Sequence, residues 1–343
     1  MPEPRNVLLI RFGAMGDVIL ATPAIRAAAA ACGAGRIDFL TKSAYRPLVR
    51  NHPSMGRVLK FGGRDGAGFW SMVRTVRAGR YDAVIDLQNS WRSRFLSLFS
   101  GAETRGTVKI GRWKRFLLVR CRRDRYGDVL PVPLKYLAAA SVIGARDDGK
   151  GLDLAVDPEE SEAAAGLLKS AGLATGRPLI ALAPGAGRAT KRWPAERFGA
   201  VASAFIARGY AAAFIGGEAD KPACAEALKS AGGPSADLAG VFSLAGTAGL
   251  ISRSRLLVTN DTGLMHMATA LRVPCVAVFG PTTRHFGFFP FRAASAVVEK
   301  PLACRPCSYH GTDRCPQGHF RCMLDIEAGE VLSAAERLLI PEN

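Results

Sequence analysis

Short apolar runs alternate with amphipathic helical stretches along most of the chain, and this alternation constrains the fold more than any other feature. The runs at 7–10, 36–40 and 81–87 have the length and composition of buried strands, and a helical pattern at 69–78 precedes the third run. Strands that alternate with helices in this way build a parallel sheet with helices on both faces. The first half of the chain is therefore predicted to be an α/β domain.

The same pattern restarts after about residue 155. An acid-rich segment with an early proline, at 157–160, is typical of a helix start. Four buried strands and a last amphipathic helix are predicted after it, at 179–183, 211–215, 256–259, 274–279 and 327–339. A chain of 343 residues suits two domains of ordinary size, which we place at 1–155 and 156–343.

An apolar content of 48% indicates a folded globular protein rather than a disordered one. No apolar run is long enough to span a bilayer, because Pro23 and Arg26 interrupt the longest candidate, at 18–34. The first residues lack a basic segment followed by a short apolar one, so no secretory signal is predicted. We expect the protein to stay in the cytosol.

Basic residues outnumber acidic ones, which gives the chain a formal net charge of +17. A chain this basic is expected to have an acidic partner: nucleic acid, an anionic membrane or a phosphorylated substrate. Much of the excess lies between residues 92 and 125, where only Glu103 and Asp124 oppose it. We interpret this run as an anion-facing surface; the alternative is a solvated surface that favours solubility.

Polar loops follow the predicted strands, at the edge where open α/β sheets bind ligands. The first loop, at 11–17, contains Gly13 and Gly16, which allow a tight turn, and it places Asp17 at the entrance to a helix. It lacks the G-x-G-x-x-G fingerprint of dinucleotide-binding proteins. Asp17 is therefore either a helix cap or a functional carboxylate.

The next two loops suit a nucleotide. In the loop at 184–194, Gly185 and Gly187 expose backbone N–H groups, and Lys191 adds a compact charge that suits a diphosphate. An acid at a strand end can accept hydrogen bonds from both hydroxyls of a ribose, and Glu218 has this position. The alternatives are an ordinary loop with a solvated lysine, and a surface glutamate that opens the next helix.

The fourth loop, at 260–266, puts Asp261 and Thr262 at a helix start, where free N–H groups and the helix dipole favour an anion. Thr262 and His266 are four residues apart, so they share one face of that helix. The alternatives are a capping aspartate and a histidine buried in the core. Four such loops at the carboxyl edges of two successive sheets favour function over four independent caps.

Together these segments resemble glycosyltransferase family 9, the ADP-heptose:lipopolysaccharide heptosyltransferases, over nearly the whole chain. The matching motifs are a strand, G-D turn and T-P-A helix at 7–26, D-L-Q at 86–88, K-x-W-P within 184–194, and the segments 260–266 and 279–282. The resemblance implies a GT-B fold, in which two Rossmann-like domains face a central cleft and the C-terminal helix packs back on the first domain. It also implies an inverting transfer of heptose from ADP-heptose to a hydroxyl of the lipopolysaccharide inner core.

Residue roles come with the resemblance. Asp17 matches the residue assigned as general base in that family, and catalysis requires no metal or other cofactor. Lys191 matches the contact to the donor phosphates, Glu218 the ribose contact and Asp261 the contact to a sugar hydroxyl. The whole donor-binding set that the resemblance implies is Thr190, Lys191, Glu218, Asp261, Thr262, Gly263 and His266.

The basic first domain is expected to face the acceptor, a phosphorylated Kdo–lipid A or heptosyl core at the cytoplasmic face of the inner membrane. The candidate acceptor-binding residues share an uncompensated positive charge; they are Arg92, Arg94, Arg112, Lys114 and Arg115. Basic side chains beside Trp91, Trp113 and Phe116 would suit peripheral contact with an anionic membrane.

Four of the eight cysteines cluster near the end of the chain, at Cys304, Cys307, Cys315 and Cys322. They could close a structural zinc site, which would stabilise a segment with little core of its own. The gap between the pairs is shorter than in a zinc ribbon. Free thiols are the alternative, whereas disulfides are disfavoured in the cytosol.

Two other functions remain open from the sequence. One is another enzyme of the same architecture, such as a different GT-B glycosyltransferase or a sugar-nucleotide epimerase. The other is a zinc-containing nucleic-acid-binding protein, which the charge and the cysteines suggest. No recognition motif or regular aromatic pattern supports it, so no nucleic-acid partner is expected. Which heptose is transferred depends on the shape of the pocket, which the sequence does not give.

Overall fold

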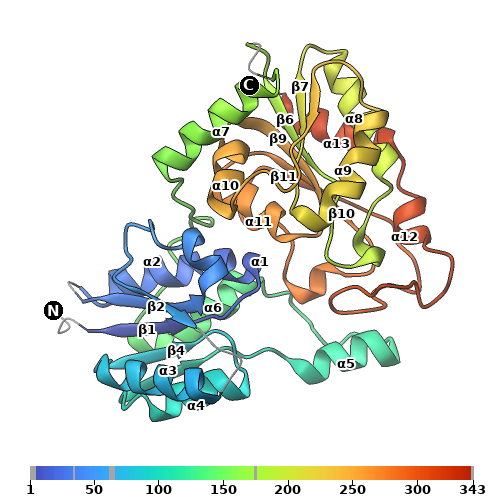
Figure 1. Cartoon of the computed structure of the whole chain (residues 1–343). Coiled ribbons are helices and arrows are strands. Elements are labelled where there is room, and N and C mark those ends of the chain that lie inside the picture. The colour runs from blue at the N-terminus through green and yellow to red at the C-terminus, as the bar shows by residue number, and fades with distance from the viewer. Residues whose placement is uncertain (1–4, 34, 62–65, 174–175, 341–343) are drawn as a thin grey trace. The chain divides into compact units, whose positions relative to one another are not determined.

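The computed structural model describes residues 5–33, 35–61, 66–173 and 176–340. The chain forms two compact units (Figure 1). The first unit contains residues 1–111 and 130–155, and the second contains residues 112–129 and 156–343. The chain therefore contributes one short segment to the second unit before it has completed the first.

Five parallel strands form the sheet of the first unit, in the order β3-β2-β1-β4-β5. Their bounds are β1 Val7–Ile10, β2 Ile37–Lys42, β3 Val58–Phe61, β4 Ala83–Asp86 and β5 Thr104–Thr107. From β1 the chain builds outward through β2 and β3, and it then crosses back to add β4 and β5 on the other side. The order changes direction between β1 and β4, and such switch points are where open α/β sheets bind ligands.

Helices cover both faces of this sheet, as the alternating pattern predicts (Figure 1). They are α1 Met15–Leu20, α2 Thr22–Ala31, η1 Ser43–Leu48, α3 Gly66–Ala78, α4 Trp91–Phe99, α6 Val132–Ala140 and η2 Ser141–Ile143. On one face α3 packs on α4, and buried side chains such as Met72, Val76 and Leu96 join the strands in one core. On the other face α2 packs on α6.

Six parallel strands form the sheet of the second unit, in the order β11-β10-β9-β6-β7-β8. Their bounds are β6 Leu179–Ala183, β7 Ala211–Phe214, β8 Ser235–Asp237, β9 Ser254–Asn260, β10 Cys275–Phe279 and β11 Ser295–Glu299. The chain builds from β6 through β7 to β8, and then from β9 through β10 to β11 on the other side. This sheet therefore has its own switch point, between β6 and β9.

The helices of the second unit include the last helix of the chain. They are α5 Arg112–Cys121, α7 Pro158–Ser170, η3 Ala189–Lys191, α8 Ala195–Ile206, η4 Glu218–Asp220, α9 Lys221–Lys229, α10 Leu244–Ser252, α11 Gly263–Ala270, η5 Arg284–Phe286, α12 Arg321–Leu324 and α13 Ala328–Leu339. The family resemblance implies that the C-terminal helix, α13, packs back on the first domain. The apolar face of α13 packs on α8 and the sheet of its own unit, where Val331, Ala334 and Ala335 are part of the core. In the described part of the chain, no helix is both long and apolar enough to cross a membrane.

A single boundary at residue 155 does not divide the chain into its two units, because residues 112–129, which contain α5, belong to the second unit. The guanidinium of Arg115 lies 3.8 Å from the centre of the Tyr309 ring, and Arg122 donates a hydrogen bond to the carbonyl of Pro306. These contacts tie the segment to the cysteine-rich part of the second unit. A boundary drawn from composition does not reveal them, because they join residues far apart in the sequence.

Candidate functional site

Gly13 shapes the loop that follows β1. Its φ of +146° is one that L side chains rarely adopt, and a Cβ added there would lie 2.3 Å from the ring of Tyr45. Glycine is therefore required for this close approach. The predicted tight turn is present, and it leads into α1, where Asp17 is the third residue.

Asp17 accepts hydrogen bonds from three groups. Its Oδ2 lies 2.5 Å from the Arg11 guanidinium and accepts a hydrogen bond from the Ala14 N–H at 3.3 Å. Its Oδ1 accepts a hydrogen bond from the Tyr136 hydroxyl at 3.2 Å. The contact with Ala14 is a helix cap, which is one of the two roles that the sequence leaves open for Asp17. The contacts with Arg11 and Tyr136 go beyond a cap, since side chains from two other elements hold the same carboxylate.

The residues that follow β4 hold Arg11 in place. Arg11 donates a hydrogen bond to the Leu87 carbonyl at 2.9 Å, and the Gln88 side chain accepts one from the Phe12 N–H at 3.1 Å. Asp86 is fully buried and accepts a hydrogen bond from the Gln88 N–H, and its burial raises its pKa. The D-L-Q element therefore joins the loops of β4 and β1 at the switch point of the sheet.

In the second unit, Lys191 and Asp261 form an ion pair. The Lys191 Nζ lies 2.6 Å from Asp261 Oδ2 and 3.3 Å from the Asp261 carbonyl oxygen. The same Oδ2 accepts a hydrogen bond from the Thr282 hydroxyl at 2.7 Å. Lys191 follows β6 and Asp261 follows β9, which are neighbours in the sheet. The structure thus brings two of the predicted donor residues together at the second switch point.

Asn260 and Asp220 support the loop at 184–194, and neither was predicted to have a role. The Asn260 amide donates to the carbonyls of Pro184 and Gly185, at 2.8 and 3.2 Å. Its side-chain oxygen accepts a hydrogen bond from the Trp193 N–H. A Cβ added to Gly185 would lie 2.1 Å from Asp220 Oδ1, so glycine lets this carboxylate approach the loop. Because Asn260 lies inside the motif at 260–266, its position in the sequence could have indicated that it supports a loop.

The remaining predicted donor residues near these loops already have local roles. Thr262 caps α11 by accepting a hydrogen bond from the Leu264 N–H, and Gly263 is the first residue of that helix. His266 is buried on the same helix, as the alternative of a core histidine predicts. The Thr190 hydroxyl donates to the carbonyl of Thr312 at 2.7 Å, so it contacts the cysteine-rich segment.

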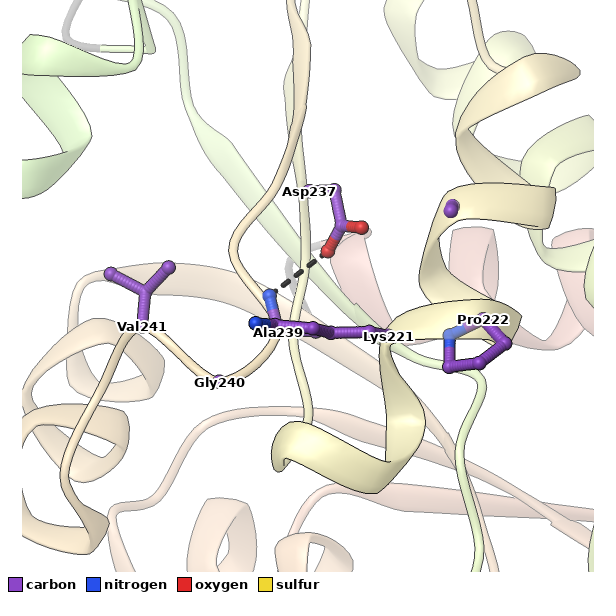
Figure 2. Close-up of a pocket in the computed structure, with 7 residues that line it drawn as sticks. Lys221, Pro222, Asp237, Ala239, Gly240 and Val241 are labelled. Atoms are coloured by element: carbon purple, nitrogen blue, oxygen red, sulfur yellow. Dashed lines mark hydrogen bonds between the residues drawn. The ribbon is translucent and has the colours of Figure 1, made fainter.

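Glu218 opens the short helix η4 after β7, and its exposed carboxylate pairs with Lys221 at 2.7 Å. Lys221 lines an open pocket of about 480 Å³, a size that suits a small ligand (Figure 2). The other residues that line it are Pro222, Ala225, Asp237, Ala239, Gly240 and Val241. A Cβ added to Gly240 would lie 2.4 Å from Glu218 Oε2, so Glu218 borders this pocket.

The candidate acceptor-binding residues fall into two groups. Arg92 and Arg94 lie on α4 in the first unit, where the Arg92 guanidinium lies 5.1 Å from the centre of the Trp91 ring. The other three lie on α5 in the second unit; they are Arg112, Lys114 and Arg115. The predicted domain boundary would put all five residues in the first unit, whereas the structure puts only two of them there.

The cysteines near the end of the chain have free thiols. The Sγ of Cys304 lies 3.8 Å from Nε2 of His319, and burial together with the neighbouring Cys307 raises the pKa of Cys322 to about 11. In the described part of the chain, no three histidine, cysteine or carboxylate side chains are arranged to hold a metal ion. As placed, Cys304, Cys307, Cys315 and Cys322 do not form the predicted zinc site.

Comparisons with known proteins agree with these motifs. Residues 69–314 match the model of glycosyltransferase family 9 (heptosyltransferase). Lipooligosaccharide heptosyltransferase 2 of Haemophilus influenzae is 30% identical over 305 residues, which cover 82% of this chain and 85% of that protein. Lipopolysaccharide heptosyltransferase 2 of Salmonella typhimurium is 28% identical, and the match covers 98% of this chain and 99% of that protein.

Solved structures share the fold. The E. coli ADP-heptose LPS heptosyltransferase II has a TM-score of 0.77 and 25% identity, over 97% of this chain and 98% of that one. A family 9 glycosyltransferase from Veillonella parvula has a TM-score of 0.80 at 24% identity, over 98% and 97%. The two parallel sheets with their helices are those of the GT-B fold, which confirms the predicted fold class. The prediction of an enzyme is also confirmed: this chain belongs to glycosyltransferase family 9.

Proposed function

We propose that this protein transfers heptose from ADP-heptose to a hydroxyl of the phosphorylated lipopolysaccharide inner core. The observation that carries the proposal is the Lys191–Asp261 pair at the switch point of the second sheet, in a chain of this family. A lysine and a carboxylate at that position can contact a diphosphate and a sugar hydroxyl, respectively. The names of the relatives from Haemophilus influenzae and Salmonella typhimurium support heptose as the sugar and lipopolysaccharide as its destination.

The chemical step needs one base. An oxygen of the acceptor hydroxyl bonds to the anomeric carbon of heptose while the bond from that carbon to the β-phosphate oxygen breaks. ADP leaves with the electron pair, the anomeric configuration inverts, and Asp17 takes the hydroxyl proton. Asp17 Oδ2 already accepts from Arg11 and Ala14, whereas Oδ1 accepts only the long hydrogen bond from Tyr136 among these contacts. Oδ1 is therefore the oxygen that we assign to accept the proton of the acceptor hydroxyl.

The donor is assigned to the second unit. Lys191 contacts the diphosphate, with Thr190 beside it in the same loop, and Glu218 binds the ribose at the border of the pocket lined by Lys221. Asp261 binds a hydroxyl of the heptose. The first N–H groups of α11, at Thr262 and Gly263, favour the phosphates, and His266 completes the set from the same helix.

The acceptor is assigned to the basic residues. Arg92 and Arg94 on α4, and the three basic residues of α5, bind phosphate groups of the inner core. We further propose that the enzyme works in the cytoplasm, in peripheral contact with the anionic face of the inner membrane, and that nucleic acid is not a partner. The high net charge supports an anionic partner, and no nucleic-acid-recognition motif is present in the sequence.

The test is a mass spectrum of the product formed from ADP-heptose and a panel of truncated core acceptors. The expected product has gained one heptose, and its formation depends on the acceptor's phosphorylated core. The acceptor that reacts also shows whether the first or a later heptose is added. Transfer from a different sugar nucleotide, with none from ADP-heptose, would contradict the proposal and favour another GT-B enzyme. A steep salt dependence of tight binding to random duplex DNA would favour a nucleic-acid partner.

We keep zinc as a structural proposal only, separate from the chemistry. The support is the contact of Cys304 with His319 at 3.8 Å, in a segment whose four cysteines are free thiols. Binding would require the segment to rearrange, because the side chains do not form a site as placed. Elemental analysis of the purified protein tests this proposal, and one equivalent of zinc that is lost after replacement of Cys304 and Cys322 by serine would support it.

A further inference from the structure

An exposed aromatic surface covers α3 and α4 in the first unit. Trp70 and Trp91 are 54% and 69% exposed; Trp91 is the first residue of α4, and Trp70 is the fifth residue of α3. We call this surface the aromatic ledge, and its members are Phe69, Trp70, Trp91, Phe95, Leu98 and Phe99. Exposed apolar groups that gather in one place, rather than singly, indicate an interaction site.

Ring contacts join the two helices into one surface. The ring centre of Phe69 lies 5.7 Å from that of Trp91 and 5.5 Å from that of Phe95, and Trp70 lies 5.6 Å from Phe95. The inner sides of the same helices already fill the core of the sheet. A surface helix needs one apolar side to fold against its sheet. Beyond that side, Trp70 on α3 and Trp91, Leu98 and Phe99 on α4 remain exposed. The packing of the sheet does not account for the exposed tryptophans.

The ledge is also basic. The helices α3 and α4 contain four arginines, Arg74, Arg77, Arg92 and Arg94, and no aspartate or glutamate. Indole rings favour the boundary between water and hydrocarbon, while arginines beside them can reach lipid phosphates. This combination complements an anionic lipid surface. A second copy of the chain complements it less well, because the same arginines would have to meet across the contact.

We propose that the aromatic ledge docks the first unit on an anionic membrane surface. Both α3 and α4 begin at the carboxyl edge of their sheet, which is also the edge where Asp17 lies. Trp70 and Trp91 are therefore at the end of the ledge nearest that edge. Docking through this end would bring the head group of a lipid-anchored acceptor to Asp17 while its acyl chains stay in the membrane. This inference rests on the proposed function and deepens it, because it names the surface that makes the membrane contact; vesicle binding can still be measured separately from heptose transfer.

The test compares binding of the whole chain to vesicles of phosphatidylcholine alone and of phosphatidylcholine mixed with phosphatidylglycerol. The wild type should bind the anionic vesicles, and Trp70→Ser combined with Trp91→Ser should weaken that binding by at least about tenfold. Val142→Ser is the control, since this side chain is 49% exposed in the same unit but lies outside the ledge. A competing variant, Trp113→Ser with Phe116→Ser, removes the exposed aromatic pair of α5.

Unchanged vesicle binding of the ledge variant would overturn the proposal, and so would a loss confined to the α5 variant. If the ledge variant changes the molar mass in light scattering while vesicle binding stays the same, a second copy covers the ledge and the membrane does not. Transfer to an acceptor without acyl chains separates this inference from the proposed function. The ledge variant should keep its kcat on that acceptor. A wild type that transfers no heptose would refute the function and leave the vesicle result standing.

Discussion

The two units place an ion pair at the same topological position, the switch point of a parallel sheet, but they hold the partners of that pair differently. In the first unit both partners are anchored: Arg11 donates to the Leu87 carbonyl, and Asp17, 2.5 Å from Arg11, also accepts from Ala14 and Tyr136. In the second unit the carboxylate is anchored: Asp261 accepts from Thr282 and holds Lys191 at 2.6 Å. One unit therefore presents a fixed carboxylate, and the other presents a cation on a flexible stem.

This difference matches the two tasks of the proposed reaction. A base must be held in one orientation, which Arg11 and Tyr136 ensure for Asp17. A phosphate contact must adapt to its ligand, and the long side chain of Lys191 can turn from Asp261 to a diphosphate without backbone movement. The same topological position thus serves as a rigid support in one sheet and as an adaptable contact in the other.

The largest expected effect comes from Asp17→Asn. An amide can still cap α1, so a purely structural Asp17 would lose little activity. A general base would lose about 10²–10⁴-fold in kcat, with ADP affinity and Tm close to wild type. Transfer assays measure kcat, and calorimetry measures ADP affinity and Tm. We expect the large loss in kcat. A variant that retains most of its kcat would reduce the ion pair of the first unit to a helix cap.

Acid should destabilise the first unit. Burial, and then the charge of Arg26, lower the pKa of His52 in the first unit from 6.5 to about 4. The unfolded chain therefore binds a proton on His52 near pH 6.5, and the folded chain does so only near pH 4. Stability should fall as the pH drops through this window, by up to about 3 kcal/mol.

The measurement is Tm against pH, for the wild type and for His52→Gln. The variant should lose less stability than the wild type between pH 6.5 and pH 4, because glutamine does not titrate. A hydrogen bond from Arg26 lowers the pKa of Asp148 from 3.8 to about 2, so this carboxylate contributes its full stabilisation above pH 3.8. That contribution is lost only as the pH falls through about 2. Parallel curves for the two proteins would contradict the role of His52.

Lys191→Ala tests whether the lysine of the second unit contacts the diphosphate. Removal of a charge-assisted contact to the diphosphate should weaken ADP binding by about 1.5–3 kcal/mol in calorimetry. Lys229→Ala is a matched control, because this exposed lysine of the same unit pairs with Glu226 on α9. Unchanged ADP affinity in the Lys191 variant would make the pair of the second unit a structural contact only.

The smallest effects are expected at the basic residues. Serine at Arg92 and Arg94, or at the three basic positions of α5, should raise the acceptor KM by roughly fivefold at low salt. The salt dependence of KM should flatten, while ADP affinity stays unchanged. Testing the two groups separately shows whether one unit or both contact the acceptor. An acceptor KM that neither variant alters would remove these residues from the acceptor site.

The strands that the sequence reveals and those that it does not differ in their place in the sheet. The buried apolar runs predict β1, β2, β4, β6, β7, β9 and β10 to within about two residues. The four strands without such a signal are β3, β5, β8 and β11, which are the edges of the two sheets. Edge strands are short or half-exposed, so β5 reads Thr-Arg-Gly-Thr and resembles a loop. The periodic pattern reports burial, and burial is incomplete at an edge.

Within the site, the sequence predicts loops better than contacts. Gly13, Lys191 and Asp261 stand out because they follow buried strands, at the edge of the sheet where ligands bind. Tyr136 cannot be identified this way, since it is 119 residues from Asp17 and comes from the middle of a helix. Asp220 is similar, because its contact with the loop at Gly185 exists only after folding. The partners that orient a functional group are set by tertiary packing.

The course of the chain through residues 112–129 has a consequence for synthesis. Arg122 emerges from the ribosome 184 residues before Pro306, the residue whose carbonyl it contacts in the folded protein. All strands of the first sheet precede Arg122 in the chain, so that sheet can form early. Until the cysteine-rich segment follows, α5 and the residues after it lack the contacts of Arg115 with Tyr309 and of Arg122 with Pro306. The last part of the chain to be made therefore decides when this early helix reaches its final place.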